Sequence, residues 1–334
     1  MIHRQILHTE KAIDLVKETF THQLKSALKL TKVSAPIASL DGTGINDDLN
    51  GIERPVKFPV KALGDEQAVV VHSLAKWKRL RLAQLDVPVG EGIVTDMRAL
   101  RPDEDFTPLH SIYVDQWDWE QVMPPERRTV DFLRQTVEKI YEVLKATEQT
   151  IAAAFPDVPA VLPDEITFIT AEELLQNYPR LSVKERESAF AKEHGAIFIM
   201  GIGGELSTGE PHDGRAPDYD DWSTKHAQGK GLNGDIVVWH PVLEQAFELS
   251  SMGIRVDAEA LKEQLRIRGC EERASLDFHK RLLSGELPQS IGGGIGQSRM
   301  AMFMLKKKHI GEVQVGLWSD EVVEMMKAQG VELL

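Results

Sequence analysis

The residues best suited to chemistry in this sequence lie in the glycine-rich segment 292–299, which ends in Arg299. Four glycines in five positions carry no Cβ atoms and let the backbone approach a bulky ligand closely. The apolar run 300–305 follows and is typical of a buried helix, so we expect Arg299 at a helix entrance suited to phosphate. Gln297 replaces the last glycine of the dinucleotide fingerprint, and the sequence has no P-loop motif. By itself the segment is compatible with a packing turn or with a phosphate cradle.

Other segments place charged side chains on apolar strands. In such a strand Gln116 and Asp118 share one face, because successive side chains alternate. A face of this kind cannot be ordinary core, since each unpaired buried polar group costs about 1–3 kcal/mol. Such a face is either exposed to solvent or the floor of a polar site. Four segments of this kind, together with the segment that ends in Arg299, favour a polar site. The segments concerned are 70–79, 97–105 with 109–120, 215–222, and 234–236 with 247–256.

Hydrophobic periodicity predicts the elements that position these residues. Several strands follow one another without an intervening helix, which indicates an α+β fold with an antiparallel sheet flanked by helices. No repeat or linker divides the chain, so a single domain over 1–334 is expected. Helices are predicted at 5–29, 130–153, 171–177, 183–194, 257–268 and 271–284, and strands at 32–37, 67–74, 92–100, 109–120, 196–202, 235–239, 246–256 and 312–318.

Composition excludes several classes of protein. The chain is 42% hydrophobic and 27% charged, which is typical of a globular protein with a substantial core. A net charge of −13 argues against a protein that grips a nucleic-acid backbone. The single cysteine, Cys270, excludes an intramolecular disulfide and a cysteine-based zinc cluster. No apolar stretch approaches the length of a membrane span and no signal peptide is evident, so a cytoplasmic protein without a membrane partner is expected.

Three segments resemble the signature motifs of class II aminoacyl-tRNA synthetases. The run 101–105 with the strand containing Asp-Gln-Trp-Asp resembles the second motif, closest to the aspartyl type. The segment 292–299 resembles the third motif. Residues 5–37 resemble the first motif, which forms the dimer in that class, so the resemblance implies a homodimer.

Two spacings extend the resemblance. Ser73 and Lys78 keep the five-residue spacing of the aspartate-binding segment in aspartyl enzymes. Glu248 and Arg255 keep the seven-residue spacing between a metal-binding glutamate and a substrate-binding arginine.

The closer match, over essentially the whole chain, is to the ammonia-dependent asparagine synthetases, or aspartate–ammonia ligases. It rests on the runs HSLAKWKR, LRPDED, YVDQWDWE, RAPDYDDW, FELSSMGIRVDA and GGGIGQSR. The resemblance implies a class II synthetase-like fold and ATP-dependent amidation of L-aspartate by ammonia. The route would be a β-aspartyl-adenylate, with release of AMP and pyrophosphate. A tRNA partner is not expected, because the acidic chain would repel tRNA and lacks a tRNA-binding domain.

The resemblance also assigns the nucleotide site. Arg101 would bind the α-phosphate and Arg299 the γ-phosphate side, tasks that suit a bidentate guanidinium. Asp235 and Glu248 would hold Mg²⁺, which prefers hard carboxylate oxygens. The full set expected to bind ATP is Arg101, Asp103, Glu104, His110, Ser111, Asp235, Glu248, Ser251 and Arg299.

Charge matching orients the aspartate. The cationic Lys78 and Arg255 are candidates for its α-carboxylate, and Asp118 for its α-ammonium, with Ser73 nearby. The β-carboxylate is then left to face the phosphate and Gln116.

Ammonium must lose a proton before it attacks, and a carboxylate near the acyl carbon could accept that proton. The candidates are Asp47 and Asp220; a loop or helix cap for Asp47 and a turn for Asp220 are the alternatives. A glutamine-dependent enzyme would need a nucleophilic cysteine, but residue 2 is Ile and Cys270 lies in a charged stretch. Free ammonia is therefore the expected donor. The predicted catalytic residues are Asp47, Arg101, Gln116, Asp220 and Arg299.

Two other functions stay open at this point. A synthetase relative that aminoacylates a carrier would share the motifs. A non-catalytic sensor of an amino acid or AMP is disfavoured, because Arg101, Glu248 and Arg299 are all present. The glycine-rich, charged loops 41–50 and 203–230 are candidate lids.

Overall fold

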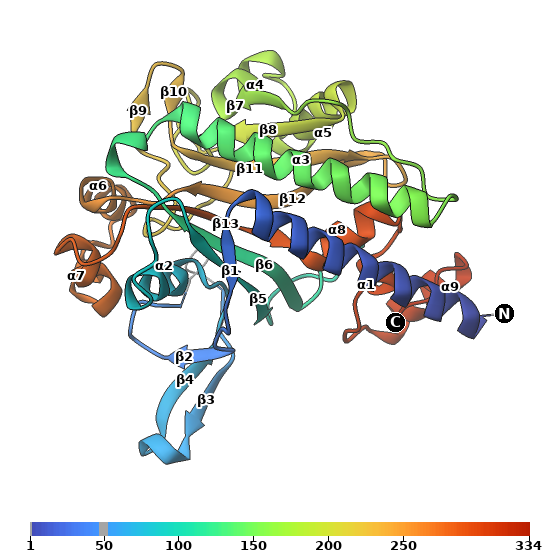
Figure 1. Ribbon diagram of the computed structural model, residues 1–334, viewed down its shortest axis with the longest axis horizontal. Helices are drawn as coiled ribbons and strands as arrows, with labels where there is room; N and C mark the ends of the chain where they lie inside the picture. Colours follow the sequence, from blue (N-terminus) through green and yellow to red (C-terminus); the bar gives the residue numbers. More distant parts are fainter. Residues whose placement is uncertain (1, 47–52) are drawn as a thin grey trace.

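An eight-stranded sheet forms the centre of the molecule (Figure 1). The computed structural model describes residues 2–46 and 53–334. The six central strands are antiparallel, whereas the outer strands β1 and β7 pair in parallel with β5 and β8. In spatial order the strands are β1 (Leu30–Lys32), β5 (Gly92–Leu100), β6 (Tyr113–Val122), β13 (Ser290–Gly296), β12 (Gln245–Ile254), β11 (Asn233–His240), β8 (Ala196–Met200) and β7 (Thr167–Thr170). The predicted α+β class with an antiparallel sheet is confirmed.

Two long helices cover one face of the sheet. The helices α1 (Ile2–Ala27) and α3 (Val130–Ala154) lie side by side across it, together with α8 (Gln297–Met304) (Figure 1). Phe20 of α1 and Leu133 of α3 are fully buried against a core that includes Trp117 and Trp119 of β6. Because the side chains of β6 alternate, Gln116 and its polar neighbours face away from this core.

The opposite face is covered only in part. The helices α4 (Ala171–Asn177) and α5 (Val183–His194) pack near β8 and β11, and α2 (Ala75–Gln84) packs against β6 and β13. Both α4 and α5 begin with a capping box, formed by Thr170 with Glu173 and by Ser182 with Glu185. These local signals explain why the predicted bounds 171–177 and 183–194 agree with the structure.

The remaining elements lie at the periphery. A small sheet of order β2-β4-β3 projects from the body (Figure 1). Its strands are β2 (Ala38–Leu40), β3 (Lys57–Val60) and β4 (Glu66–Val70). The others are α6 (Ala258–Arg268), α7 (Asp277–Leu283), α9 (Asp320–Ala328), β9 (Lys225–His226), β10 (Gly229–Lys230), and the 3₁₀ turns η1 (Lys61–Leu63), η2 (Pro125–Arg127), η3 (Glu271–Ser275) and η4 (Ile310–Glu312).

Several predicted elements differ in the structure. The strand predicted at 67–74 ends at Val70, and the strand predicted at 109–120 begins at Tyr113. The strand expected at 312–318 is wrong: η4 ends there and an irregular segment follows, in which Val315 and Leu317 are exposed. The helix expected at 271–284 is divided into η3 and α7, because Leu276 between them has extended backbone. The strand expected at 32–37 is shorter and earlier, at β1.

The glycine-rich segment is a strand rather than a turn. As β13 it lies between β6 and β12, and α8 begins directly after it. A Cβ on Gly292 would lie 2.0 Å from Glu120 Oε2, and one on Gly294 would lie 2.3 Å from Gln116 Oε1. Glycine is needed here because side chains of the neighbouring strand fill the space above β13.

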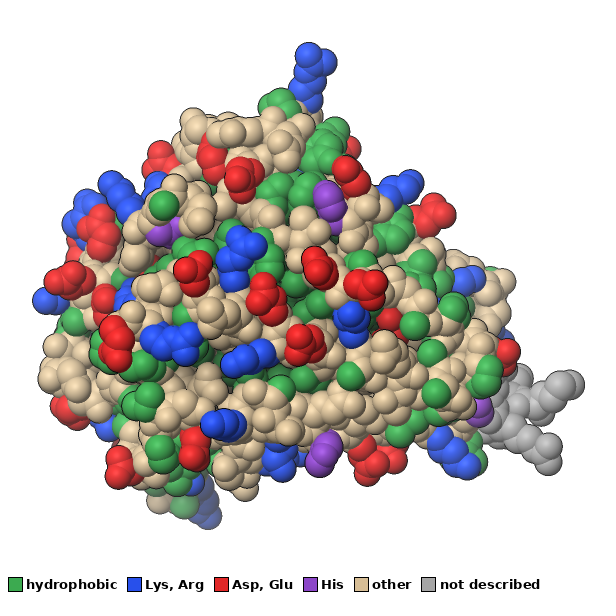
Figure 2. Space-filling model, turned by 45° about the horizontal axis from the view of Figure 1, so that its top comes forward, with side chains coloured by type: hydrophobic (Ala, Val, Ile, Leu, Met, Phe, Trp, Pro, Cys, Tyr) green, Lys and Arg blue, Asp and Glu red, His purple; other side chains and the backbone are tan. Residues whose placement is uncertain are grey.

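Charges of both signs are interspersed over the face of the molecule shown in Figure 2. That face has no continuous basic stripe. Among the described helices, none is long and apolar enough to cross a membrane.

Candidate active site

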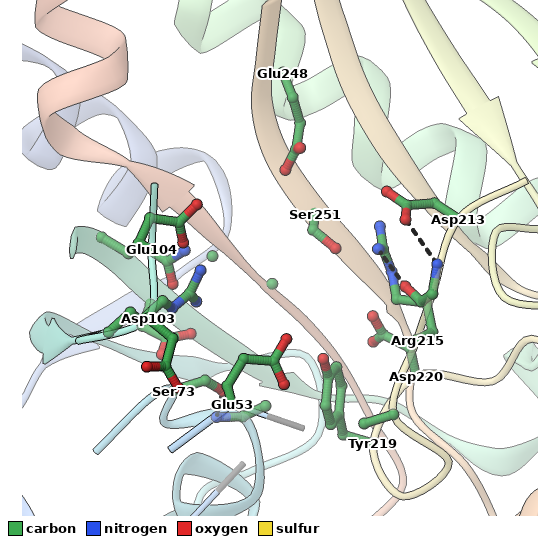
Figure 3. Close-up of a pocket in the computed structure, with 18 of the residues that line it drawn as sticks. Glu53, Ser73, Asp103, Glu104, Asp213, Arg215, Tyr219, Asp220, Glu248 and Ser251 are labelled. Carbon is green, nitrogen blue, oxygen red and sulfur yellow. Dashed lines mark hydrogen bonds between the residues drawn. The ribbon is translucent and has the colours of Figure 1, made fainter. Parts of the chain in front are cut away.

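Two adjoining cavities open over the polar face of β6, β12 and β13. The larger has a volume of about 450 Å³ and the smaller about 230 Å³. Both are lined by Arg101, Glu104, Gln116, Glu248 and Gly294, so the two spaces meet at these residues. In Figure 3, Glu248 and Ser251 extend from one strand, Arg215 and Asp220 stand on one side, and Asp103 and Glu104 on the other.

Most of the predicted site residues line these cavities. The exceptions in the described part of the chain are Lys78 and Asp235. Around the larger cavity are Ser73, Arg101, Asp103, Glu104, Gln116, Asp118, Asp220, Glu248, Ser251 and Arg255; around the smaller one are Arg101, Glu104, His110, Ser111, Gln116, Glu248 and Arg299. The structure thus brings together residues from seven strands, helices and loops that the sequence separates widely.

Arg255 is held by two buried carboxylates. Its Nε donates to Glu120 Oε1 at 2.9 Å, its Nη2 to Glu120 Oε2 at 2.8 Å, and its Nη1 to Asp220. Burial raises the pKa of the Asp220 carboxyl above its ordinary value, against the opposing charge of Arg255. Burial works against ionisation of Glu120 as well, but Arg255 and then Lys78 keep its pKa below the ordinary value.

Sequence reasoning missed Glu120 as a member of the site. The signal was present, because Glu120 has the same strand parity as Gln116 and Asp118 and therefore the same face.

Lys78 lies behind the cavity wall rather than on it. Its ammonium is fully buried and donates to Asp118 Oδ1, to the Trp119 carbonyl at 2.9 Å and to the Gly293 carbonyl at 3.1 Å. These contacts fix the carboxylate of Asp118, which does line the cavity. Direct contact between Lys78 and a substrate stays a prediction.

Arg299 is oriented by a histidine in the smaller cavity. Its Nη2 lies 2.7 Å from His110 Nε2, and its Nη1 donates to the Glu248 carbonyl at 3.1 Å. Burial, followed by the charge of Arg299, lowers the pKa of His110 to about 4, so its imidazole is neutral at pH 7. Nε2 is then the acceptor, and Nδ1–H is left to donate to Thr107 Oγ1 at 2.8 Å.

Asp235 is buried beneath Arg215, another residue that the sequence analysis did not assign to the site. Arg215 Nη2 donates to both carboxylate oxygens of Asp235, at 2.5 and 2.6 Å. Burial, and beside it the charge of Glu248, raise the pKa of Asp235 to about 6 despite Arg215. The described residues contain no cluster of three or more His, Cys, Asp or Glu side chains suited to a metal. Asp235 and Glu248 offer two interacting carboxylates, whose hard oxygens fit Mg²⁺ when phosphate oxygens complete the set.

Asp47, a candidate proton acceptor, lies outside the described residues. Asn46, directly before it, accepts a hydrogen bond from the backbone N–H of His72 at 2.8 Å. Glu53 lines the larger cavity. At the rim, a hydrogen-bonded ion pair with Arg54 lowers the pKa of Asp103.

The fold is that of the class II synthetase core. The structure of asparaginyl-tRNA synthetase from Pyrococcus horikoshii complexed with asparaginyl-adenylate matches with a TM-score of 0.66, at 15% identity over 92% of this chain and 68% of that one. An aspartyl-tRNA synthetase from Entamoeba histolytica matches with a TM-score of 0.63, at 13% identity over 94% of this chain and 58% of that one. At these identities the matches show the fold alone.

Sequence comparison is more specific. A model of the aspartate–ammonia ligase family matches residues 7–330. An aspartate–ammonia ligase from Parabacteroides distasonis is 56% identical over 327 residues, which is 98% of this chain and 95% of the relative. One from Clostridium perfringens is 52% identical over 326 residues, with the same coverage of both chains. Because both similarities extend over nearly the whole sequence, including the strands that build the two cavities, the chain belongs to the aspartate–ammonia ligase family.

Proposed function

We propose that this chain makes L-asparagine from L-aspartate and ammonia in two steps, through a β-aspartyl-adenylate, with release of AMP and pyrophosphate. Family membership gives the overall reaction, an ATP-dependent ligation of ammonia to aspartate. A carboxylate does not accept ammonia directly, because an oxide would have to leave. Adenylylation of the β-carboxylate creates a good leaving group. The observation that carries the two-step proposal is the junction of the cavities at Arg101 and Gln116.

The larger cavity is the proposed aspartate site. Asp118, fixed from behind by Lys78, would bind the α-ammonium, and Arg255 would bind the α-carboxylate. The β-carboxylate would then face Gln116 and Arg101. Both residues line both cavities, which supports an orientation in which the β-carboxylate meets the nucleotide.

The junction and the smaller cavity are the proposed ATP site. Arg101 would contact the α-phosphate, where charge develops during transfer of AMP. Arg299 would bind the γ-phosphate side, with His110 holding one of its guanidinium nitrogens. The neutral imidazole suits this arrangement, because a second cation beside Arg299 would repel it.

Asp235 and Glu248 would hold Mg²⁺ in the ATP complex. The ion supplies positive charge to phosphate oxygens. The support is chemical: two carboxylates on the neighbouring strands β11 and β12 lie close enough for the charge of one to raise the pKa of the other.

Deprotonation of ammonium is assigned to Asp220 or Asp47. Asp220 lines the larger cavity, and its raised pKa makes it a better proton acceptor than an ordinary aspartate. An acidic lining that includes Asp118 and Glu53 would also attract the ammonium cation.

A single catalytic domain over 1–334, a homodimer and a cytoplasmic location belong to the same proposal. The dimer is supported by the likeness of residues 5–37 to a dimer-forming motif, and the location by the single unpaired Cys270. Sedimentation equilibrium and cell fractionation would test them; a monomer at micromolar concentration, or the protein in the secreted fraction, would contradict them.

Product analysis tests the reaction. The protein is incubated with ATP, Mg²⁺, ammonium chloride and L-aspartate labelled with ¹⁸O in its β-carboxylate. We expect asparagine and AMP in equal amounts, with one ¹⁸O atom transferred to AMP. Formation of AMP without asparagine would favour the carrier-aminoacylating alternative, and unlabelled AMP would exclude the β-aspartyl-adenylate. If no nucleotide is consumed, the chain is not a ligase.

A further inference from the structure

The guanidinium of Arg215 is hydrogen-bonded to Asp235, a carboxylate that the proposed function assigns to magnesium. One nitrogen, Nη2, donates to both oxygens of Asp235. The two side chains are only 12% and 8% exposed. Without nucleotide, therefore, the positive charge next to Asp235 comes from the protein itself.

The position of Arg215 is built into the loop that carries it. Gly203 leaves room for its stem, since a Cβ there would lie 2.8 Å from Arg215 Cβ. Arg268 Nη2 donates to the Arg215 carbonyl at 3.3 Å. These contacts fix the backbone and the first part of the side chain, while the guanidinium extends into the wall of the larger cavity (Figure 3).

The guanidinium has hydrogen-bond donors that do not contact Asp235. Nη1 donates to the Gly214 carbonyl at 3.0 Å, but the buried Nε–H has no hydrogen-bond partner among the described residues. A buried donor without an acceptor is costly, so a movement of the guanidinium that gives Nε–H an acceptor would be favourable. The larger cavity, which Arg215 lines, meets the proposed ATP site at Arg101 and Glu248, and phosphate oxygens at that junction are suitable acceptors for a guanidinium.

We propose that Arg215 is a phosphate-binding residue that stays on Asp235 until Mg²⁺ and ATP arrive together. Asp235 would then be free to hold the ion, and the released guanidinium would donate to a phosphate oxygen of the same nucleotide. This inference rests on the proposed metal site at Asp235 and Glu248.

The physical reason is charge balance. Asp235 is buried on the strand next to that of Glu248, and a buried carboxylate is costly unless a cation pairs with it. Arg215 supplies it before ATP binds, and it blocks a free divalent ion from the same carboxylate. Once the metal has arrived, two cations cannot share Asp235, whereas the triphosphate offers Arg215 new oxygens.

Binding of Mn²⁺ to the protein without nucleotide, followed by electron paramagnetic resonance, tests the inference. Wild type is compared with Arg215→Gln, Arg215→Lys and the double variant Arg215→Gln/Asp235→Asn. We expect Arg215→Gln to bind Mn²⁺ at least about tenfold more tightly than wild type, since it removes the competing cation. Arg215→Lys should stay near wild type because it keeps the charge, and the double variant should lose the gain.

Equal Mn²⁺ affinity of wild type and Arg215→Gln would overturn the inference, and so would an equal gain in Arg215→Lys. A second measurement needs no variant: wild type should bind Mn²⁺ far more tightly with ATP than without. If its Mn²⁺ affinity is the same in both conditions, Arg215 does not block the site.

The metal site itself is tested separately with Asp235→Asn and Glu248→Gln in the presence of ATP. If both bind Mn²⁺–ATP as wild type does, the carboxylates are not metal ligands, and the metal part of the proposed function fails together with the inference. If they bind it more weakly while Arg215→Gln resembles wild type without nucleotide, only the role of Arg215 is wrong.

Discussion

The guanidinium of Arg299 donates a hydrogen bond to the imidazole of His110, with 2.7 Å between Nη2 and Nε2. The contact joins the start of α8 to the segment before β6, which are separated by 189 residues in the sequence. It aims one arm of the guanidinium across the smaller cavity before any nucleotide is present. Orientation of this kind lowers the entropy lost on binding.

Replacing Arg299 by lysine should weaken ATP binding selectively. Lysine keeps the charge but loses the planar fork that contacts His110 and a phosphate together. We expect the KM for ATP to rise by about tenfold or more. The KM for aspartate should change little. Steady-state kinetics with each substrate varied would measure both, with Arg266→Lys, an exposed arginine paired with Glu263, as the control. Equal rises in both KM values would contradict a role confined to ATP.

The titration of His110 should make the folded protein less stable in acid. Burial and then Arg299 lower its pKa from 6.5 to about 4. As the pH falls below 6.5, the unfolded chain takes up a proton on this imidazole and the folded protein does not. The free energy of unfolding should therefore decrease between pH 6.5 and 4.

His110→Gln should lose less stability than wild type over that range, measured by urea unfolding at pH 7 and pH 5. His240, whose pKa is also lowered to about 4, is present in both proteins and cancels in the comparison. Parallel pH dependences would show that His110 is protonated equally in both states.

Gly294→Ala should impair catalysis more than folding. The new Cβ would lie 2.3 Å from Oε1 of Gln116, and the other close atoms belong to the same amide. Because this is the end of a flexible side chain, Gln116 should move while the strand stays in place. We expect kcat/KM for aspartate to fall by about tenfold, with the free energy of unfolding changed by less than about 1 kcal/mol.

The matched control is Gly316→Ala, whose Cβ would have no atom nearer than 3.5 Å. Gly292→Ala is the opposite case, since its Cβ would also lie 2.6 Å from the Trp119 carbonyl, and it should destabilise the protein. Full activity in Gly294→Ala would mean that Gln116 need not hold its present position.

Asp220→Asn should separate the two half-reactions. If Asp220 accepts the proton of ammonium, asparagine formation should fall by about 100-fold or more. Aspartate-dependent exchange between pyrophosphate and ATP should persist. If both rates fall equally, Asp220 acts only by holding Arg255. Asp47→Ala in the same assays would show which carboxylate carries the role.

Glu120→Gln should destabilise the protein strongly. The substitution removes the carboxylate charge that pairs with buried Arg255. The same carboxylate lies 3.6 Å from the Lys78 ammonium. Loss of one partner from a buried ion pair costs about 3–5 kcal/mol. Chemical denaturation would measure this loss, with Glu263→Gln at an exposed pair expected to show no measurable change. An unchanged midpoint in Glu120→Gln would mean that other groups neutralise Arg255.

The local signals in the sequence determined much of this protein. The capping boxes of α4 and α5, the apolar stripe of α3 and the alternation along β6 act between neighbours in the chain, so periodicity and residue type were enough to predict them. The resemblance of its motifs also identified the family, and most of the residues assigned to the site from sequence line the two cavities.

Only the tertiary structure decided which of those residues contact one another. Lys78 donates a hydrogen bond to the carbonyl of Gly293, 215 residues away in the sequence, and this contact places Lys78 behind Asp118. Arg215 pairs with Asp235; both charges are visible in the sequence, but their pairing is not. The glycines of β13 likewise need their neighbours: their role follows from Glu120 and Gln116 on the adjacent strand. A buried charge pairs with whichever opposite charge the packed sheet brings within hydrogen-bond distance, and that choice depends on strand order, which residue spacing does not encode.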